Sequence, residues 1–174
     1  FWGFQNFDVM PDIVTMAKGL GNGIPIAAVT TRREIAETLT QRLHFNTFGG
    51  NPVSMAQGLA VMDVIEEDGL QANARAVGGH CIEGMQRLMS KHTLIGDVRG
   101  KGLMLGMELV RDRRTKDPAI EEAVVVLEKA RDRGLLIGKT GLFGNVLRIK
   151  PPLCITKDDI DFALDVLDEV LGSV

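Results

Sequence analysis

Tyrosine is absent from this sequence of 174 residues, tryptophan occurs once and cysteine only twice. Cys81 and Cys154 are far apart and show no metal-ligand spacing, so we expect no metal site and two reduced core thiols. No uninterrupted apolar stretch is long enough to span a bilayer, so a membrane partner is not expected. The net charge is −3 and no block of lysine and arginine stands out. This balance speaks against a nucleic-acid partner.

Hydrophobic residues make up 45% of the chain, which is enough for one ordinary core or two small ones. The 20 glycines cluster between periodic segments and do not form a low-complexity tract. The chain begins at Phe1 and not at a methionine, and Phe1–Phe4 does not resemble a signal or transit peptide. We therefore expect an incomplete chain whose upstream part, with any targeting signal, is missing.

The spacing of apolar residues predicts alternating strands and helices. Short apolar or β-branched runs bounded by glycine and proline predict buried strands at 12–17 and 26–30. Further strands are expected at 95–102, 103–110, 135–137 and 146–149, and helices at 53–67, 70–91, from Asp117, and after Thr156. Thr31 and Thr156 are predicted N-caps, because an acidic residue follows each three positions later. The pattern predicts an α/β fold, in which the first part is the tail of an α/β sheet, the second part is an α+β module, and a helix near residues 53–90 joins them.

Lys18 lies between an apolar run and the glycine-rich stretch Gly19–Gly23. A lysine there has little to solvate it, and a partly desolvated amine can act as a Schiff-base nucleophile. The glycines would let a flat cofactor approach the backbone closely. The alternative is a strand-end lysine that points to water before an ordinary turn. The order of residues matches neither a Walker loop nor a dinucleotide fingerprint.

The segment His44–Pro52 is a second candidate site. Thr47 offers a hydroxyl, Gly49 and Gly50 can expose backbone N–H groups, and a predicted helix begins directly afterwards. This combination is typical of an anion or phosphate site. The alternative is that Asn51 and Pro52 simply cap the helix.

Arg148 lies between apolar residues on a predicted short strand. An arginine in this setting is expected to have a specific anionic partner, and a carboxylate bound through two hydrogen bonds suits it. The alternative is a structural salt bridge. Asp97, Arg99, Lys101 and Glu108 are expected to make turns and ion pairs instead of acting as acids or bases.

Four segments in this order resemble the class III pyridoxal-phosphate-dependent aminotransferases. They are Pro11–Gly23, His44–Pro52, Val98–Leu103 and Leu147–Pro152, and the similarity extends over essentially all 174 residues. Within the family, Phe1–Gln5 and Leu153–Lys157 are similar to the alanine–glyoxylate branch.

The resemblance implies a fold-type-I transferase with pyridoxal 5'-phosphate as cofactor. It also implies that residues 1–74 are the end of the large mixed-sheet domain and that residues 75–174 are the small α+β domain. Lys18 would hold the cofactor through a Schiff base and, once displaced by the substrate amine, would move the proton at the substrate α-carbon. Thr47 would contact the cofactor phosphate across a dimer interface, and Arg148 would hold the substrate carboxylate. The parent would be a homodimer or a dimer of dimers.

The implied reaction moves an amino group from alanine or a related amino acid to glyoxylate or pyruvate, two small 2-oxo acids. A mitochondrial location is expected, with a cytoplasmic or peroxisomal one as alternative. Other readings are ω-amino-acid:pyruvate or ornithine/4-aminobutyrate transamination. A non-catalytic interaction remnant and a phosphate or nucleotide binder that uses the glycine loops also stay open.

The resemblance also implies what these 174 residues do not contain. The family's aspartate for the pyridine nitrogen, its ring-stacking aromatic and its first phosphate-binding glycine loop have no counterpart here and would lie upstream. Without that aspartate the cofactor is a weaker electron sink. We therefore expect this chain alone to be a poor catalyst or none.

Overall fold

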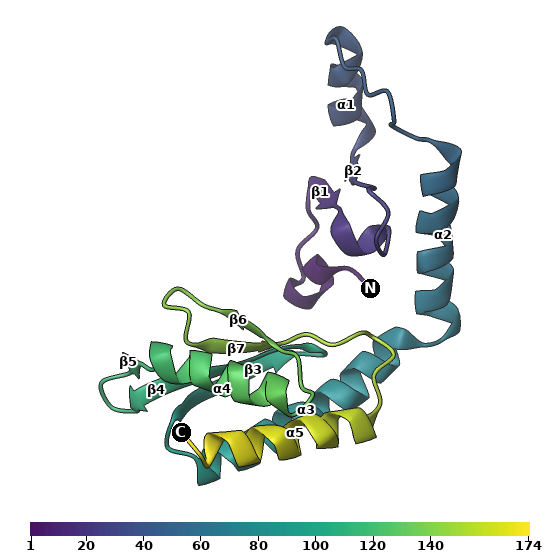
Figure 1. Cartoon of the computed structure of the whole chain (residues 1–174). Helices are drawn as coiled ribbons and strands as arrows, with labels where there is room; N and C mark the ends of the chain where they lie inside the picture. The colour runs from purple at the N-terminus through teal and green to yellow at the C-terminus, as the bar shows by residue number, and fades with distance from the viewer. The chain divides into compact units, whose positions relative to one another are not determined.

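The computed structural model describes all 174 residues, which divide into two compact units, Phe1–Gly69 and Leu70–Val174 (Figure 1). Both helices and strands occur, as the predicted α/β class requires. None of the helices is long and apolar enough to cross a membrane. The predicted domain division after residue 74 concerns the domains of the parent fold and stays a prediction.

The first unit contains a two-stranded antiparallel sheet and one long helix. Its elements are η1 (Gly3–Phe7), β1 (Ile13–Met16), η2 (Lys18–Leu20), β2 (Ala28–Thr31), α1 (Arg33–Ala36), η3 (Glu37–Gln41) and α2 (Pro52–Glu67). β1 pairs with β2 so that Ile13 lies opposite Thr31. The two strands stand where the apolar runs predict them.

The prediction that these two strands are buried is wrong. Their residues are exposed or only half-buried, and Val29 is 67% exposed. All the buried hydrophobic residues of the molecule belong to the second unit. The physical reason is the small size of the sheet, because a sheet of only two strands cannot bury its own side chains.

Thr31 is not the N-cap of α1, which corrects a second expectation. Arg32 occupies that position without a side-chain cap, and the helix has only four residues. Because Thr31 is the last residue of β2, its hydroxyl instead donates to the carbonyl oxygen of Asp12 at 2.8 Å. The Thr31 side chain therefore links β2 to the residue before β1 and does not cap the helix, although the capping pattern had predicted that it would.

Helix α2 begins and ends at the predicted signals. Asn51 is the N-cap, and its side-chain oxygen accepts from the backbone N–H of Ser54 at 3.0 Å. Pro52 occupies the first turn, where its missing N–H does no harm. The helix stops at Asp68, and Gly69 follows with a φ of 62° that glycine adopts without strain.

The second unit is a sheet with helices packed on one face. The strand path is β3-β4-β7-β6, all antiparallel, with the short β5 beside β4. The elements are α3 (Leu70–Lys91), β3 (Ile95–Lys101), β4 (Met104–Asp112), β5 (Asp117–Pro118), α4 (Ile120–Asp132), β6 (Gly138–Thr140), β7 (Val146–Ile149) and α5 (Lys157–Leu171). Inward side chains alternate with outward ones along the strands, as in β4, where Leu105 and Met107 are buried and Glu108 is not.

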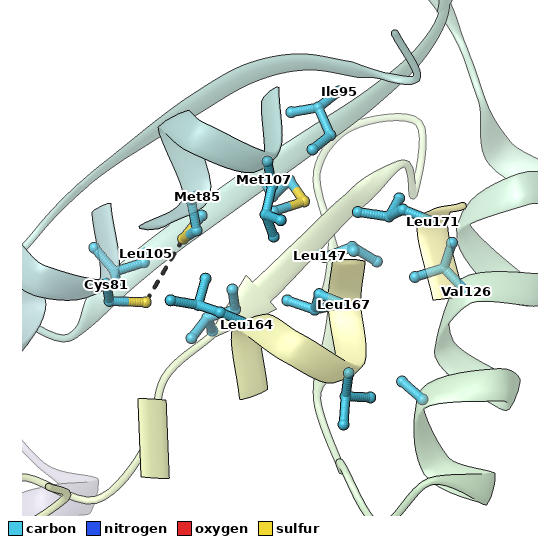
Figure 2. Close-up of a cluster of buried hydrophobic side chains, with 14 of the residues drawn as sticks. Cys81, Met85, Ile95, Leu105, Met107, Val126, Leu147, Leu164, Leu167 and Leu171 are labelled. Carbon is cyan, nitrogen blue, oxygen red and sulfur yellow. Dashed lines mark hydrogen bonds between the residues drawn. The ribbon is translucent and has the colours of Figure 1, made fainter. Parts of the chain in front are cut away.

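The core lies between the inner sheet face and the three helices (Figure 2). Met85, Met107, Leu147 and Leu167 come from α3, β4, β7 and α5, and each is at most 1% exposed. Cys81 belongs to this core, and its thiol lies 3.7 Å from the sulfur of Met85. Cys154 is exposed, so the expectation of two core thiols holds for Cys81 alone.

Two predicted boundaries are wrong in this unit. Asp117 and Pro118 do not open a helix, because they pair with the end of β4 as β5, and α4 begins at Ile120. The strand expected at 135–137 lies three residues later, at Gly138–Thr140. In its place Leu135 donates its N–H to the carbonyl of Ala130 and closes the end of α4.

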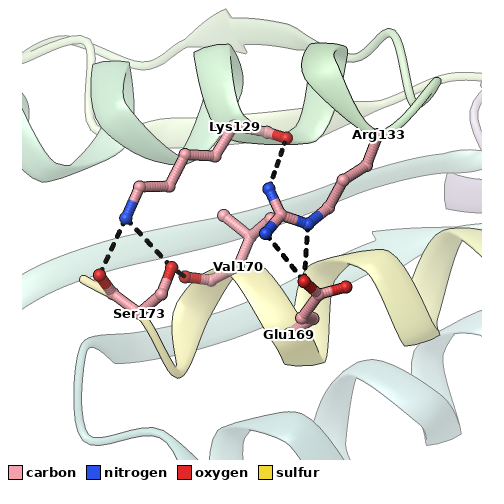
Figure 3. A network of polar contacts seen from close by, with 5 residues as sticks. All are labelled: Lys129, Arg133, Glu169, Val170 and Ser173. Carbon is pink, nitrogen blue, oxygen red and sulfur yellow. Dashed lines mark hydrogen bonds and ion pairs between the residues drawn. The ribbon is translucent and has the colours of Figure 1, made fainter.

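The last helix follows its prediction. Thr156 and Asp159 form a capping box, and the four predicted apolar positions of α5 are buried: Ile160, Leu164, Leu167 and Leu171. Polar contacts tie α4 to the C-terminal end of this helix (Figure 3). Lys129 donates to the carbonyl and the hydroxyl of Ser173, and Arg133 donates to Glu169 at 2.7 and 2.8 Å.

Candidate active site

Lys18 directly follows β1 and opens the short turn η2. Its φ is 56°, in the left-handed region that residues with a side chain rarely adopt. Such strain gathers at binding and catalytic positions, where the surrounding fold maintains it. The side chain is exposed and has neither a hydrogen bond nor an ion pair, so the expected desolvation is absent in this chain. The amine is therefore free to meet a ligand.

The glycine loop after Lys18 is held by its own packing. A Cβ on Gly21 would lie 2.4 Å from the carbonyl oxygen of Ile24 and 2.4 Å from Ile26, so only glycine fits there. The side-chain amide of Gln57 in α2 donates to the carbonyl of Gly21 at 2.9 Å. These contacts hold the turn in place while the lysine side chain stays free.

Thr47 begins an exposed turn before α2. The side chain of Asn46 accepts from the N–H of Phe48 at 3.1 Å, and the carbonyl of Asn46 accepts from the N–H of Gly49 at 3.2 Å. The Thr47 hydroxyl and the N–H groups of Thr47 and Gly50 have no partner within the chain. The loop thus caps the helix through Asn51 and also has hydrogen-bond donors that are free to bind an anion, so the two predicted alternatives occur together.

Arg148 lies on the outer face of the second unit's sheet. The strand register puts it between Gly106 of β4 and Gly138 of β6, and both neighbours are glycines. The side chain is exposed and makes no ion pair with any carboxylate of the chain. The structural salt bridge that was the alternative reading is therefore absent, and the guanidinium is available to an anion.

Arg99 provides the contrast on the same sheet face, since it lies opposite Gly106 on the other side. Its guanidinium pairs with Asp97 at 2.5 Å and with Glu108 at 2.7 Å, and hydrogen bonds to both raise its pKa above the ordinary arginine value. The prediction of structural ion pairs is confirmed for these three residues. Of the two arginines in this row, only Arg148 has no carboxylate partner within the chain and can pair with a ligand.

A groove of about 630 Å³ lies beside Arg148 in the second unit. Its walls are mainly apolar and come from the residues before β6, the end of β7 and one side of α5, including Leu136, Ile160 and Phe162. Asp159 also lines it, but this carboxylate accepts from the hydroxyl and the N–H of Thr156. The sequence did not predict these apolar walls, because Leu136 and Phe162 are exposed and do not follow the spacing of buried residues.

Lys18 and Thr47 lie on two loops of the first unit, and Arg148 lies on the sheet of the second. All three predicted site residues are exposed, and none is engaged by a side chain of the protein. No group of three or more His, Cys, Asp or Glu side chains is arranged as metal ligands would be. The first unit therefore offers an amine and a hydroxyl, which suit a carbonyl compound and an anionic group, and the second unit offers a guanidinium, which suits another anion.

The chain matches the family model described as "Aminotransferase class-III" over residues 1–171 and belongs to this family. It is 57% identical over 168 residues to the mitochondrial alanine–glyoxylate aminotransferase 2 homolog 2 of Arabidopsis thaliana, an alignment with 97% of this chain and 35% of the relative. It is 49% identical over 173 residues to the mitochondrial alanine–glyoxylate aminotransferase 2 of Homo sapiens, with 98% of this chain and 34% of the relative. The chain thus spans about a third of the length of these curated relatives.

Other relatives carry names of different chemistry. A leucine/methionine racemase of Thermococcus litoralis is 44% identical over 174 residues, with 100% of this chain and 39% of the relative. Among solved structures, a phospholyase from Arthrobacter in complex with phosphoethanolamine has a TM-score of 0.94 at 37% identity, covering 99% of this chain and 41% of its own. A Bacillus anthracis aminotransferase has a TM-score of 0.91 at 36% identity with the same coverage. These matches confirm the predicted family and the α/β class.

Proposed function

We propose that this chain is part of a pyridoxal-phosphate-dependent transaminase. The enzyme would move an amino group from alanine, or a related amino acid, to glyoxylate or pyruvate. The family match over nearly the whole chain and the identity of 49–57% to alanine–glyoxylate aminotransferases support the reaction. The single observation that carries the proposal is Lys18 at the start of a glycine turn, where its side chain has no partner and its backbone is in the left-handed region.

The residues present fit pyridoxal 5'-phosphate as a cofactor. Its aldehyde needs an amine without a competing ion pair, and Lys18 has none. Its phosphate needs several N–H and O–H donors, and the Thr47–Gly50 turn has a hydroxyl and two N–H groups without partners. Bound pyridoxal phosphate supplies the electron sink that lets an amino acid lose its α-proton.

Each residue would then have one task. The Lys18 amine would hold the cofactor covalently and, when the substrate amine replaces it, would take and return the proton at the substrate α-carbon. The Thr47 hydroxyl would donate a hydrogen bond to the phosphate, from the second subunit of a homodimer. The Arg148 guanidinium would bind the substrate carboxylate through two hydrogen bonds and so orient the α-carbon.

The same relatives support a proposal for the location of the enzyme. The relatives at 49% and 57% identity are named as mitochondrial proteins, so we propose a mitochondrial site of action. A homodimer, or a dimer of dimers, is the proposed assembly. A relative named as a leucine/methionine racemase makes racemisation the reaction to tell apart from amino transfer, and the two differ in whether the amino group leaves the substrate.

Borohydride trapping tests the proposal. The full-length protein is incubated with pyridoxal phosphate and reduced, and its peptides are analysed by mass spectrometry. A pyridoxyl group on Lys18 is expected, and a Lys18→Ala variant serves as the control that loses it. A folded protein without this label would remove the transaminase function. Amino transfer from alanine to glyoxylate, measured as glycine formed, separates the transaminase from a racemase, which would give D-alanine and no glycine.

A further inference from the structure

We propose that Gly138 is a positioning residue that sets the place of the Arg148 guanidinium on the sheet. Through Arg148 it would determine how tightly the enzyme binds the substrate carboxylate. This inference rests on the proposed role of Arg148 in substrate binding. It concerns a residue that neither motif nor charge singles out.

The contact between the two residues involves the whole charged group. β6 and β7 pair so that Gly138 lies directly opposite Arg148. A Cβ on Gly138 would lie 3.0 Å from Nη2, 3.2 Å from Nε and 3.5 Å from Cζ of Arg148. The guanidinium therefore occupies the space that a side chain on residue 138 would take.

The backbone gives no reason for a glycine at this position. The three nearby glycines Gly134, Gly141 and Gly144 have φ values of 84°, 88° and 70°, which explains each of them. Gly138 is not among the residues with positive φ, so any amino acid could adopt its backbone conformation. A glycine inside a strand weakens the strand and often marks a place where another group approaches closely. Here the approaching group is the Arg148 guanidinium.

The other side of Arg148 is different. Gly106 lies opposite Arg148 on β4, but a Cβ there would meet only Val146, at 3.2 Å, and no atom of Arg148 within 4 Å. The guanidinium thus lies toward β6 and away from β4. Gly106→Ala is therefore a matched control, since it adds the same methyl group beside the same arginine without occupying its place.

The test uses the full-length holoenzyme and propionate, an unreactive carboxylate that competes with alanine. A Cβ at residue 138 meets the flexible end of a side chain, so Gly138→Ala should fold and shift the guanidinium by a few tenths of an ångström. We expect the inhibition constant of propionate and the KM of alanine to rise about tenfold, because a two-bond carboxylate clamp is sensitive to position. Gly106→Ala should change both by less than about twofold, since its Cβ does not reach the clamp.

A double-mutant cycle separates positioning from a general effect on the sheet. Arg148→Gln alone should weaken propionate binding, and Gly138→Ala added to Arg148→Gln should cause no further loss. An equal loss in both backgrounds would overturn the inference while leaving the proposed function in place. If Arg148→Gln alone leaves propionate binding unchanged, the proposed role of Arg148 fails, and the inference fails with it. If Gly138→Ala alone does not fold, the double variant should, because the shorter glutamine relieves the contact; an unfolded double variant counts against the inference.

Discussion

Gly78 of α3 touches the backbone of Gly102, in the turn between β3 and β4. A Cβ on Gly78 would lie 2.0 Å from the carbonyl oxygen of Gly102 and 2.8 Å from its Cα. Gly102 itself has a φ of 55°. Helix and turn therefore approach each other to backbone contact, and Gly78 cannot carry a side chain without moving the turn.

Gly78→Ala should destabilise the protein by about 3 kcal/mol or more, because a new methyl group would overlap a rigid backbone. The matched control is Gly79→Ala in the next position of α3, where a Cβ would meet nothing within 4 Å. That change should be neutral or should stabilise by about 0.5–1 kcal/mol, since alanine is the better helix former. Urea unfolding of both variants is the measurement. Similar free energies of unfolding for the two would contradict the backbone contact.

Asp168 of α5 pairs with Lys91 and His92 at the end of α3, each at 2.6 Å. Hydrogen bonds from these two partners lower the pKa of Asp168 below its ordinary value of 3.8. A lowered pKa in the folded state means that the pair stabilises the fold above pH 3.8 and that this contribution is lost as the pH falls toward the lower value.

Asp168→Asn should therefore cost less than about 1 kcal/mol near pH 7, since the carboxylate is partly exposed, and less still near pH 3, which is below the ordinary pKa of 3.8. Asp165→Asn on the same helix is the control, because Asp165 is exposed and has no ion-pair partner. The free energy of unfolding is measured by urea titration at both pH values. A cost for Asp168→Asn that stays the same at pH 3 would exclude the ion pair as its source.

Leu167 is 1% exposed, in the part of the core where α5 meets the sheet (Figure 2). Leu167→Ala should cost about 2–5 kcal/mol, because it removes buried methyl groups and leaves a cavity. Leu43 is the matched control, since it is fully exposed in the first unit, and Leu43→Ala should change stability by less than about 0.5 kcal/mol. Thermal and urea unfolding measure both. A small effect at Leu167 would mean that the core is packed differently.

The two cysteines should differ strongly in reactivity. Burial raises the pKa of the Cys81 thiol to about 11, so very little thiolate is present at pH 8, and the side chain is only 2% exposed. Cys154 is exposed. A thiol reagent such as DTNB should therefore modify one cysteine per native chain quickly, and Cys154→Ser should abolish this fast reaction. Rapid labelling of Cys81 in the Cys154→Ser variant would show that the core around it opens readily.

Local sequence signals correctly predicted those elements whose start, end and buried face depend on neighbouring residues in the sequence. The capping box at Thr156 and the apolar positions of α5 are found as expected, and so are the break at Gly69 and the bounds of α3. The same reasoning was wrong at Thr31 and at Asp117. In both cases strand pairing determined the role of the residue, with β1 for Thr31 and with the adjacent end of β4 for Asp117, and a capping motif does not include the partner strand.

The sequence by itself predicted the candidate site residues, since Lys18, Thr47 and Arg148 stand out by their neighbours and by their order along the chain, and their roles stay a prediction. Only the tertiary structure decided their surroundings. It left the strand before Lys18 exposed, because two strands bury little, and it left Arg148 without a carboxylate, because Asp97 and Glu108 pair with Arg99. The contact of Arg148 with Gly138 is likewise a matter of strand register, which joins residues ten positions apart and which no pattern in either strand specifies alone.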